Sequence, residues 1–199
     1  MTDPSYDECL VDAELKARAA YSEPHRDYHD HRHLDECLDH VDGIRDLDDR
    51  GRRLLKWAIL WHDAVYEPGQ RDNEERSAEL ALSDLSGCGV AQEDSAEVAR
   101  LIRLTERHRA EPDDRLGALM VSIDLSILGA DPERYCEYSA DVRREYGHVP
   151  EQLWRTGRSL VLKRLLTADP LYPDPDFREK FEARARNNIE QEIKALGED

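Results

Sequence analysis

Apolar residues recur at helical spacing along almost the whole chain of 199 residues. Residues three and four apart share one face of a helix, so this spacing predicts amphipathic helices. No alternating apolar–polar run is long enough to indicate a strand. The sequence therefore predicts a single all-α domain over residues 1–199, a helical bundle with its core at about 26–170. Helices are predicted for residues 7–20, 28–42, 52–66, 94–108, 116–129 and about 176–196. Residues 68–85 are expected to begin as a loop and continue as a helix, and two further helices are expected to start at Asp131-Pro132 and at Pro150.

The most apolar segment, "RRLLKWAILWHDAVY", is expected to lie at the centre of the core, yet it carries His62 and Asp63 side by side. A buried carboxylate is usually paired, protonated or bound to a metal. A second acid of this kind, Asp124, stands alone in the apolar segment "LMVSIDLSIL". One cation between the two acids would neutralise both. For His62 and Asp63 taken alone, a buried ion pair or a hydrogen bond at the helix end is the alternative.

Histidines supply the rest of a candidate metal site. "RDYHDHRHL" places His29 and His33 four residues apart, on one helical face. Imidazole and carboxylate suit a divalent transition metal, so His33, His62, Asp63 and Asp124 would make four ligands. His29 is the alternative to His33, which is preferred because it lies deeper in the helix, ahead of Leu34.

The formal net charge of −17 argues against a nucleic-acid polymer or an anionic membrane surface as partner. A small anionic ligand stays open, because a metal or a cluster of Arg can reverse the sign within one cleft. The acidic C-terminal helix is expected to be solvated or to contact another copy in a homo-oligomer.

Location in the cell is expected to be cytoplasmic. No apolar run approaches the roughly 20 residues that a membrane helix needs, and "MTDPSYDECL" lacks the apolar core of a signal peptide. Four widely spaced cysteines without a CxxC motif predict reduced, scattered thiols: Cys9, Cys37, Cys88 and Cys136.

The order His, His-Asp, Asp resembles the HD superfamily of metal-dependent phosphohydrolases. The extended blocks are similar to a bacterial subfamily of predicted HD phosphohydrolases, from Arg26 to the final helix: "YHDHRHL", "WHDAVYEPGQRDNEERSAELA", "LIRLTERH", "IDLSILG" and "RREYG". The resemblance implies a helical bundle around a central metal bound by His33, His62, Asp63 and Asp124. Since only His108 lies between the HD pair and Asp124, it implies one metal ion: Mn, Fe, Co, Ni or Zn rather than Mg.

The implied activity is hydrolysis of a small phosphorylated metabolite, such as a nucleotide. This reaction needs an activated water and stabilisation of charge on the phosphoryl oxygens. Catalysis is assigned to Glu74 together with Asp63, with Glu67 as second choice for the acid, and Arg26 is the expected phosphate ligand. Further substrate contacts are predicted for Tyr28, His29, Asn73, Ser77 and His108.

Simpler roles remain open for several of these residues. Glu74 could be only a favourable charge in a helix first turn, and His108 could interact only with its helix C-terminus. Arg26 could pair with a surface acid. At the level of function, the alternatives are a regulatory domain that binds a nucleotide without turning it over, and other metal chemistry on this scaffold, such as an oxygenase or a hydratase.

Overall fold

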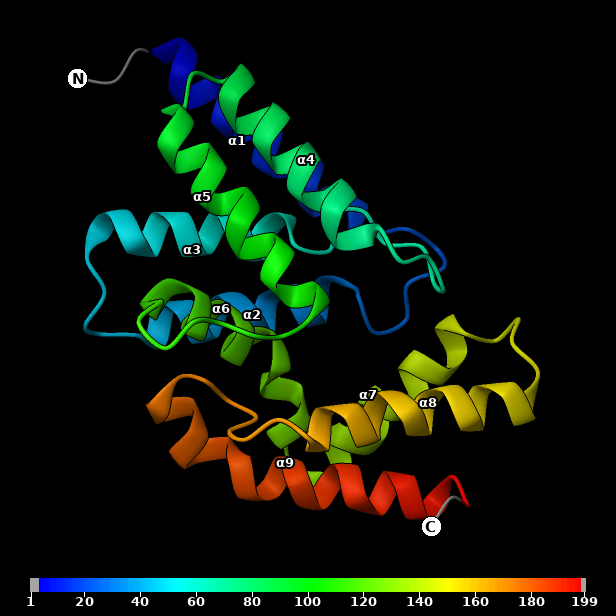
Figure 1. Ribbon diagram of the computed structural model, residues 1–199. Helices are drawn as coiled ribbons and strands as arrows, with labels where there is room; N and C mark the ends of the chain where they lie inside the picture. Colours follow the sequence, from blue (N-terminus) through cyan, green and yellow to red (C-terminus); the bar gives the residue numbers. More distant parts are fainter. Residues whose placement is uncertain (1–3, 198–199) are drawn as a thin grey trace. The chain divides into compact units, whose positions relative to one another are not determined.

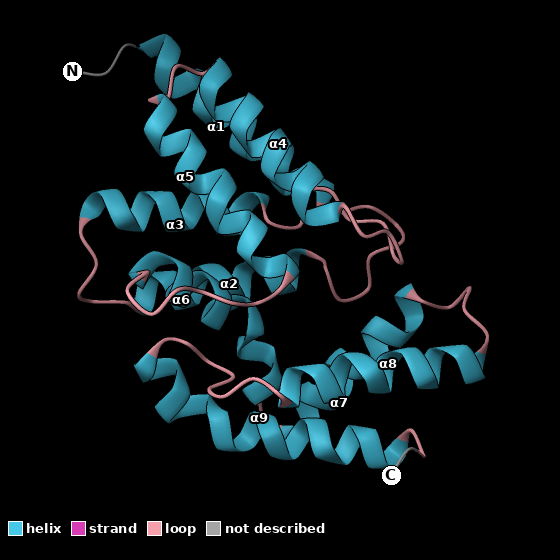
Figure 2. Cartoon of the chain, viewed as in Figure 1, coloured by secondary structure: helices cyan, strands magenta, loops and turns pink. Residues whose placement is uncertain are grey.

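The computed structural model describes residues 4–197, and within them it contains helices and loops but no strand (Figure 2). The all-α prediction is confirmed. The helices form two compact units, one reaching Arg109 and the other starting at Ala110. That residues 1–199 make one domain stays a prediction. None of the helices in residues 4–197 has the length and apolar character needed to cross a lipid bilayer.

The first unit is built around one apolar helix. Its elements are α1 (Pro4–Ala20), α2 (His31–Gly43), α3 (Asp49–Trp61), α4 (Asn73–Gly87), α5 (Gln92–Arg103) and the short η1 (Leu104–Glu106). Within α3, every residue from Leu54 to Trp61 except Lys56 is buried, which explains why α1, α2, α4 and α5 all pack on it (Figure 1). The prediction that this segment is central to the core is confirmed.

Helix α3 ends earlier than its apolar pattern indicates. The helix was predicted to continue to Tyr66, but it stops at Trp61, and His62 is the residue after its last turn. The His-Asp pair thus starts a loop of residues 62–72 and does not lie within a helix. Burial continues through the loop at Ala64 and Tyr66, so the apolar pattern there reports burial and not helix.

Two aspartates fix the start of the helices beside this loop. Asp30 caps α2 by accepting hydrogen bonds from the backbone N–H groups of Arg32 and His33. Asp48 caps α3 in the same way through Gly51 N–H, at 2.7 Å. A Cβ at Gly51 would stand 2.9 Å from the Asp48 carboxylate, so a larger residue there would displace the capping side chain.

The second unit contains α6 (Arg115–Asp124), η2 (Leu125–Gly129), α7 (Pro132–Glu145), α8 (Glu151–Leu166) and α9 (Pro175–Ala195). Helix α9 packs closely on η2, where a Cβ at Gly129 would lie 2.6 Å from Phe181. Arg158 of α8 and Glu192 of α9 form a buried ion pair at 2.8 Å. The predicted outer helix at 176–196 agrees with α9, which buries one face through Phe177, Phe181, Ala185, Asn188, Ile189 and Ile193.

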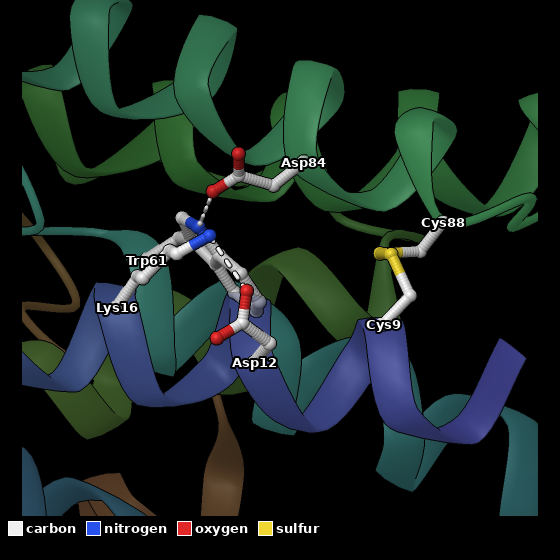
Figure 3. The surroundings of a disulfide bond; sticks show 6 residues. All are labelled: Cys9, Asp12, Lys16, Trp61, Asp84 and Cys88. Carbon is white, nitrogen blue, oxygen red and sulfur yellow. Dashed lines mark hydrogen bonds and ion pairs between the residues drawn. A yellow bond between two sulfur atoms is a disulfide. The ribbon is translucent and has the colours of Figure 1, made fainter. Parts of the chain in front are cut away.

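The prediction that all four cysteines are reduced is wrong for two of them. Cys9 of α1 and Cys88, directly after α4, form a disulfide (Figure 3). Their 79-residue separation hid the pair, because it is the packing of α1 beside α4 that brings them together. Cys37, which is buried, and Cys136, which is exposed, are not part of a disulfide. A cytoplasmic location, which rested partly on reduced thiols, stays a prediction.

Candidate metal centre

Three donor atoms of the first unit converge at the end of α3. The Nε2 atoms of His33 and His62 lie 3.1 Å apart. Asp63 Oδ2 lies 3.0 Å from His62 Nε2 and 3.6 Å from His33 Nε2. Donors that share one ion at bonds of about 2.1 Å stand roughly 3 to 3.5 Å apart, so these residues fit a single transition metal. His33 and His62 belong to a group that could hold a metal ion.

The tautomer of His62 is determined by its backbone contact. Its Nδ1 lies 2.7 Å from the carbonyl oxygen of Ile59, one turn earlier. A carbonyl only accepts hydrogen bonds, so Nδ1 carries the proton and the neutral ring presents the Nε2 lone pair to the site. Histidine ligands of metals are commonly oriented in this way.

The electrostatics of the cluster require a positive charge. The lone pair of neutral His62 and the Asp63 carboxylate are both acceptors, and they face each other at 3.0 Å. Burial acts to raise the pKa of Asp63. When His62 is protonated, its positive charge outweighs burial and holds the pKa of Asp63 well below its usual range. Either an extra proton on His62 or a bound cation satisfies the arrangement.

Tyr28 supports the other histidine. The Oη atom of this buried tyrosine lies 3.0 Å from His33 Nδ1. With a cation at Nε2, the His33 proton resides on Nδ1 and is donated to Tyr28 Oη. The structure therefore shows Tyr28 in contact with a candidate ligand, whereas its predicted contact with substrate stays a prediction.

Replacing Tyr28 with Phe is expected to weaken metal binding about 10- to 100-fold, because loss of a partner that orients a ligand has effects of this size. Competition with a chelating dye measures the dissociation constant. Tyr146→Phe, in the second unit, is the matched control and leaves the constant unchanged. Equal affinities for the Tyr28→Phe protein and the wild type would contradict the assigned contact.

Three of the predicted substrate residues hold the backbone that follows the His-Asp pair. The guanidinium of Arg26 donates to the carbonyl oxygens of Asp63 at 2.7 Å and Ala64 at 3.3 Å. Ser77 Oγ accepts from Val65 N–H and donates to the Val65 carbonyl. Asn73 makes the same pair of contacts with the backbone of Glu67. All three side chains are buried, and they fix the loop that carries Asp63.

The two candidate catalytic acids have different surroundings. Glu67 is half exposed and paired with Arg76 at 2.8 Å. Burial raises the pKa of Glu74, and the nearby Asp63 charge adds to this, although the N-terminal backbone of α4 and His108 oppose it. A raised pKa suits a group that takes up and returns protons, so these surroundings favour Glu74.

The remaining predicted residues are placed as follows. His29 stacks on Tyr66 with ring centroids 4.0 Å apart, and its charge is among those that lower the Asp63 pKa. His108 follows η1 with a positive φ of 51° and lies close enough to Glu74 to affect its pKa. Asp124, half-buried, ends α6 in the second unit, and its role as a ligand stays a prediction.

Sequence reasoning missed Tyr21. This fully buried residue follows α1, and its Oη accepts a hydrogen bond from Asp63 N–H at 3.3 Å and lies 3.4 Å from His62 Nδ1. Burial raises its pKa well above the ordinary value. In the sequence Tyr21 stands at the end of an apolar stripe, as many core residues do. Only the tertiary structure shows that it contacts His62 and Asp63.

Comparison with models of known protein families, with curated proteins and with solved structures finds no match. The site is therefore interpreted from its own geometry and from the motif residues.

Proposed function

We propose that this protein is a metal-dependent phosphohydrolase for a small phosphorylated metabolite, such as a nucleotide. The observation that carries the proposal is the convergence of His33 Nε2, His62 Nε2 and Asp63 Oδ2, three acceptor atoms within 3.6 Å of one another. Asp124 is proposed as the fourth ligand on the strength of the sequence motif. A bound transition metal supplies a water of lowered pKa and positive charge for the phosphoryl oxygens.

Glu74 is the proposed proton carrier. In the hydrolysis, the oxygen of water forms a bond to phosphorus and the bond from phosphorus to the ester oxygen breaks. Glu74 accepts the proton that the water loses and returns it to the departing ester oxygen. The raised pKa of Glu74, caused mainly by burial, favours both transfers.

The test is phosphate release by protein loaded separately with Mn, Co, Ni or Zn, across nucleoside monophosphates and sugar phosphates. Glu74→Gln is expected to lower kcat about 100-fold or more with unchanged metal content, since general acid–base catalysis contributes effects of this size. Glu75→Gln is the matched control, because Glu75 is exposed and paired with Arg103. A full kcat in the Glu74→Gln enzyme would remove Glu74 from the mechanism.

The same screen separates catalysis from simple binding. A phosphorylated compound that binds, comes off unchanged and releases no phosphate with any metal would overturn the proposal. The protein would then be a regulatory binding domain.

A further inference from the structure

A groove separate from the candidate metal centre runs between α1, α2 and α3 of the first unit. It encloses about 830 Å³, and Leu38, Trp57 and Leu60 line it together with α1. On α1, Val11 and Leu15 are 56% and 61% exposed. Val11 and Leu15 lie one helical turn apart, so they form a small exposed apolar patch beside the groove.

The charges on α1 indicate what covers this patch. Glu8, Val11, Leu15 and Arg18 follow one another at intervals of three, four and three residues, so they form one stripe along the helix. The stripe is acidic at its beginning and basic at its end. In an antiparallel pair of such helices, Val11 of each meets Leu15 of the other, and Glu8 of each meets Arg18 of the other.

A parallel pair would instead place like charges together. Arg18 already pairs with Asp35 of its own chain, but a guanidinium has five N–H donors and can bridge two carboxylates. On the α3 side of the groove, Arg53 and Lys56 are about half exposed, and each is paired with an acid of its own chain.

We propose that this stripe is the interface of a homodimer, in which the α1 helices of two copies pack antiparallel across a two-fold axis between Val11 and Leu15. A two-fold axis makes each contact occur twice, which suits a stripe that is complementary to itself. Each chain carries a net charge of −17, so the apolar contact and the two local ion pairs must outweigh a repulsion that physiological salt screens. The inference does not depend on the proposed activity.

Sedimentation equilibrium on the full chain tests the proposal without metal or substrate. The wild type is expected to be a dimer at about 100 µM, and Leu15→Glu a monomer at the same concentration. Leu153→Glu on α8, where the leucine is 65% exposed, is the control and stays a dimer. Circular dichroism confirms that each variant is folded.

A charge exchange tests the antiparallel arrangement itself. Glu8→Arg is expected to raise the dimer dissociation constant about 10-fold, and adding Arg18→Glu to restore it to within about 3-fold. A monomeric wild type at about 100 µM overturns the proposal. A dimer that survives Leu15→Glu, or a charge exchange without recovery, overturns it as well.

Discussion

Replacing Arg26 with Met is expected to lower the free energy of unfolding by about 3–5 kcal/mol, the loss typical of breaking a buried charged network. The side chain of Arg26 is fully buried; it pairs with Glu23 and donates to the carbonyl oxygens of His29, Asp63 and Ala64. Methionine fills much of the space but leaves those carbonyl groups without their donor. Urea denaturation in the presence of a chelator measures the loss without any contribution from bound metal.

The matched control is Arg76→Met. Arg76 is partly exposed and pairs with Glu67, so its loss is expected to cost less than about 1 kcal/mol. The comparison also decides between two roles for Arg26. A stable Arg26→Met protein that had lost affinity for inorganic phosphate would contradict the structural role and support the phosphate contact predicted from sequence.

The second large effect is expected from Asp63→Asn. Asparagine keeps the size of the side chain but removes the negative charge that faces His62 and His33. We expect metal affinity to fall by more than about 100-fold, because loss of a charged oxygen ligand exceeds the effect of losing a group that only orients a ligand. Titration with Co²⁺ or Zn²⁺ against a chelating dye measures this loss.

The control for Asp63→Asn is the same substitution at Asp12, an exposed residue that pairs with Lys16 (Figure 3). With a chelator present, Asp63→Asn is expected to be less stable than the Asp12→Asn protein, because it also loses the attraction between the Asp63 carboxylate and His62. Unchanged metal affinity in Asp63→Asn would show that Asp63 is not a ligand.

The sequence was most informative where burial and chemistry coincide in one residue. A histidine and an aspartate in an otherwise apolar segment are costly to bury, so His62 and Asp63 could be chosen as a candidate site before the fold was known. His33 could be chosen because it stands beside apolar Leu34, and the structure places its Nε2 against His62. The long apolar pattern of α3 likewise predicted the centre of the core.

Features that depend on tertiary packing could not be predicted in this way. Arg26, Asn73 and Ser77 were predicted to contact a substrate, and the structure shows them bonded to the backbone after the His-Asp pair. Periodicity cannot distinguish contact with a substrate from contact with a backbone group. The end of α3 at Trp61 was hidden because the next residues remain buried after the helix stops. The Cys9–Cys88 bond depends on α1 packing beside α4, which no local pattern encodes.

The central claim is that His33, His62 and Asp63 hold one metal ion, and the metal content of the protein tests it most directly. The wild type would be purified without a chelating tag and examined by elemental mass spectrometry beside His62→Ala and the exposed control His148→Ala. We predict about one transition metal ion per chain in the wild type and in His148→Ala, and less than about a tenth of that in His62→Ala. A wild type that holds no metal, and takes up none when titrated with Mn, Co or Zn, would show that the three residues form a buried polar cluster without a metal.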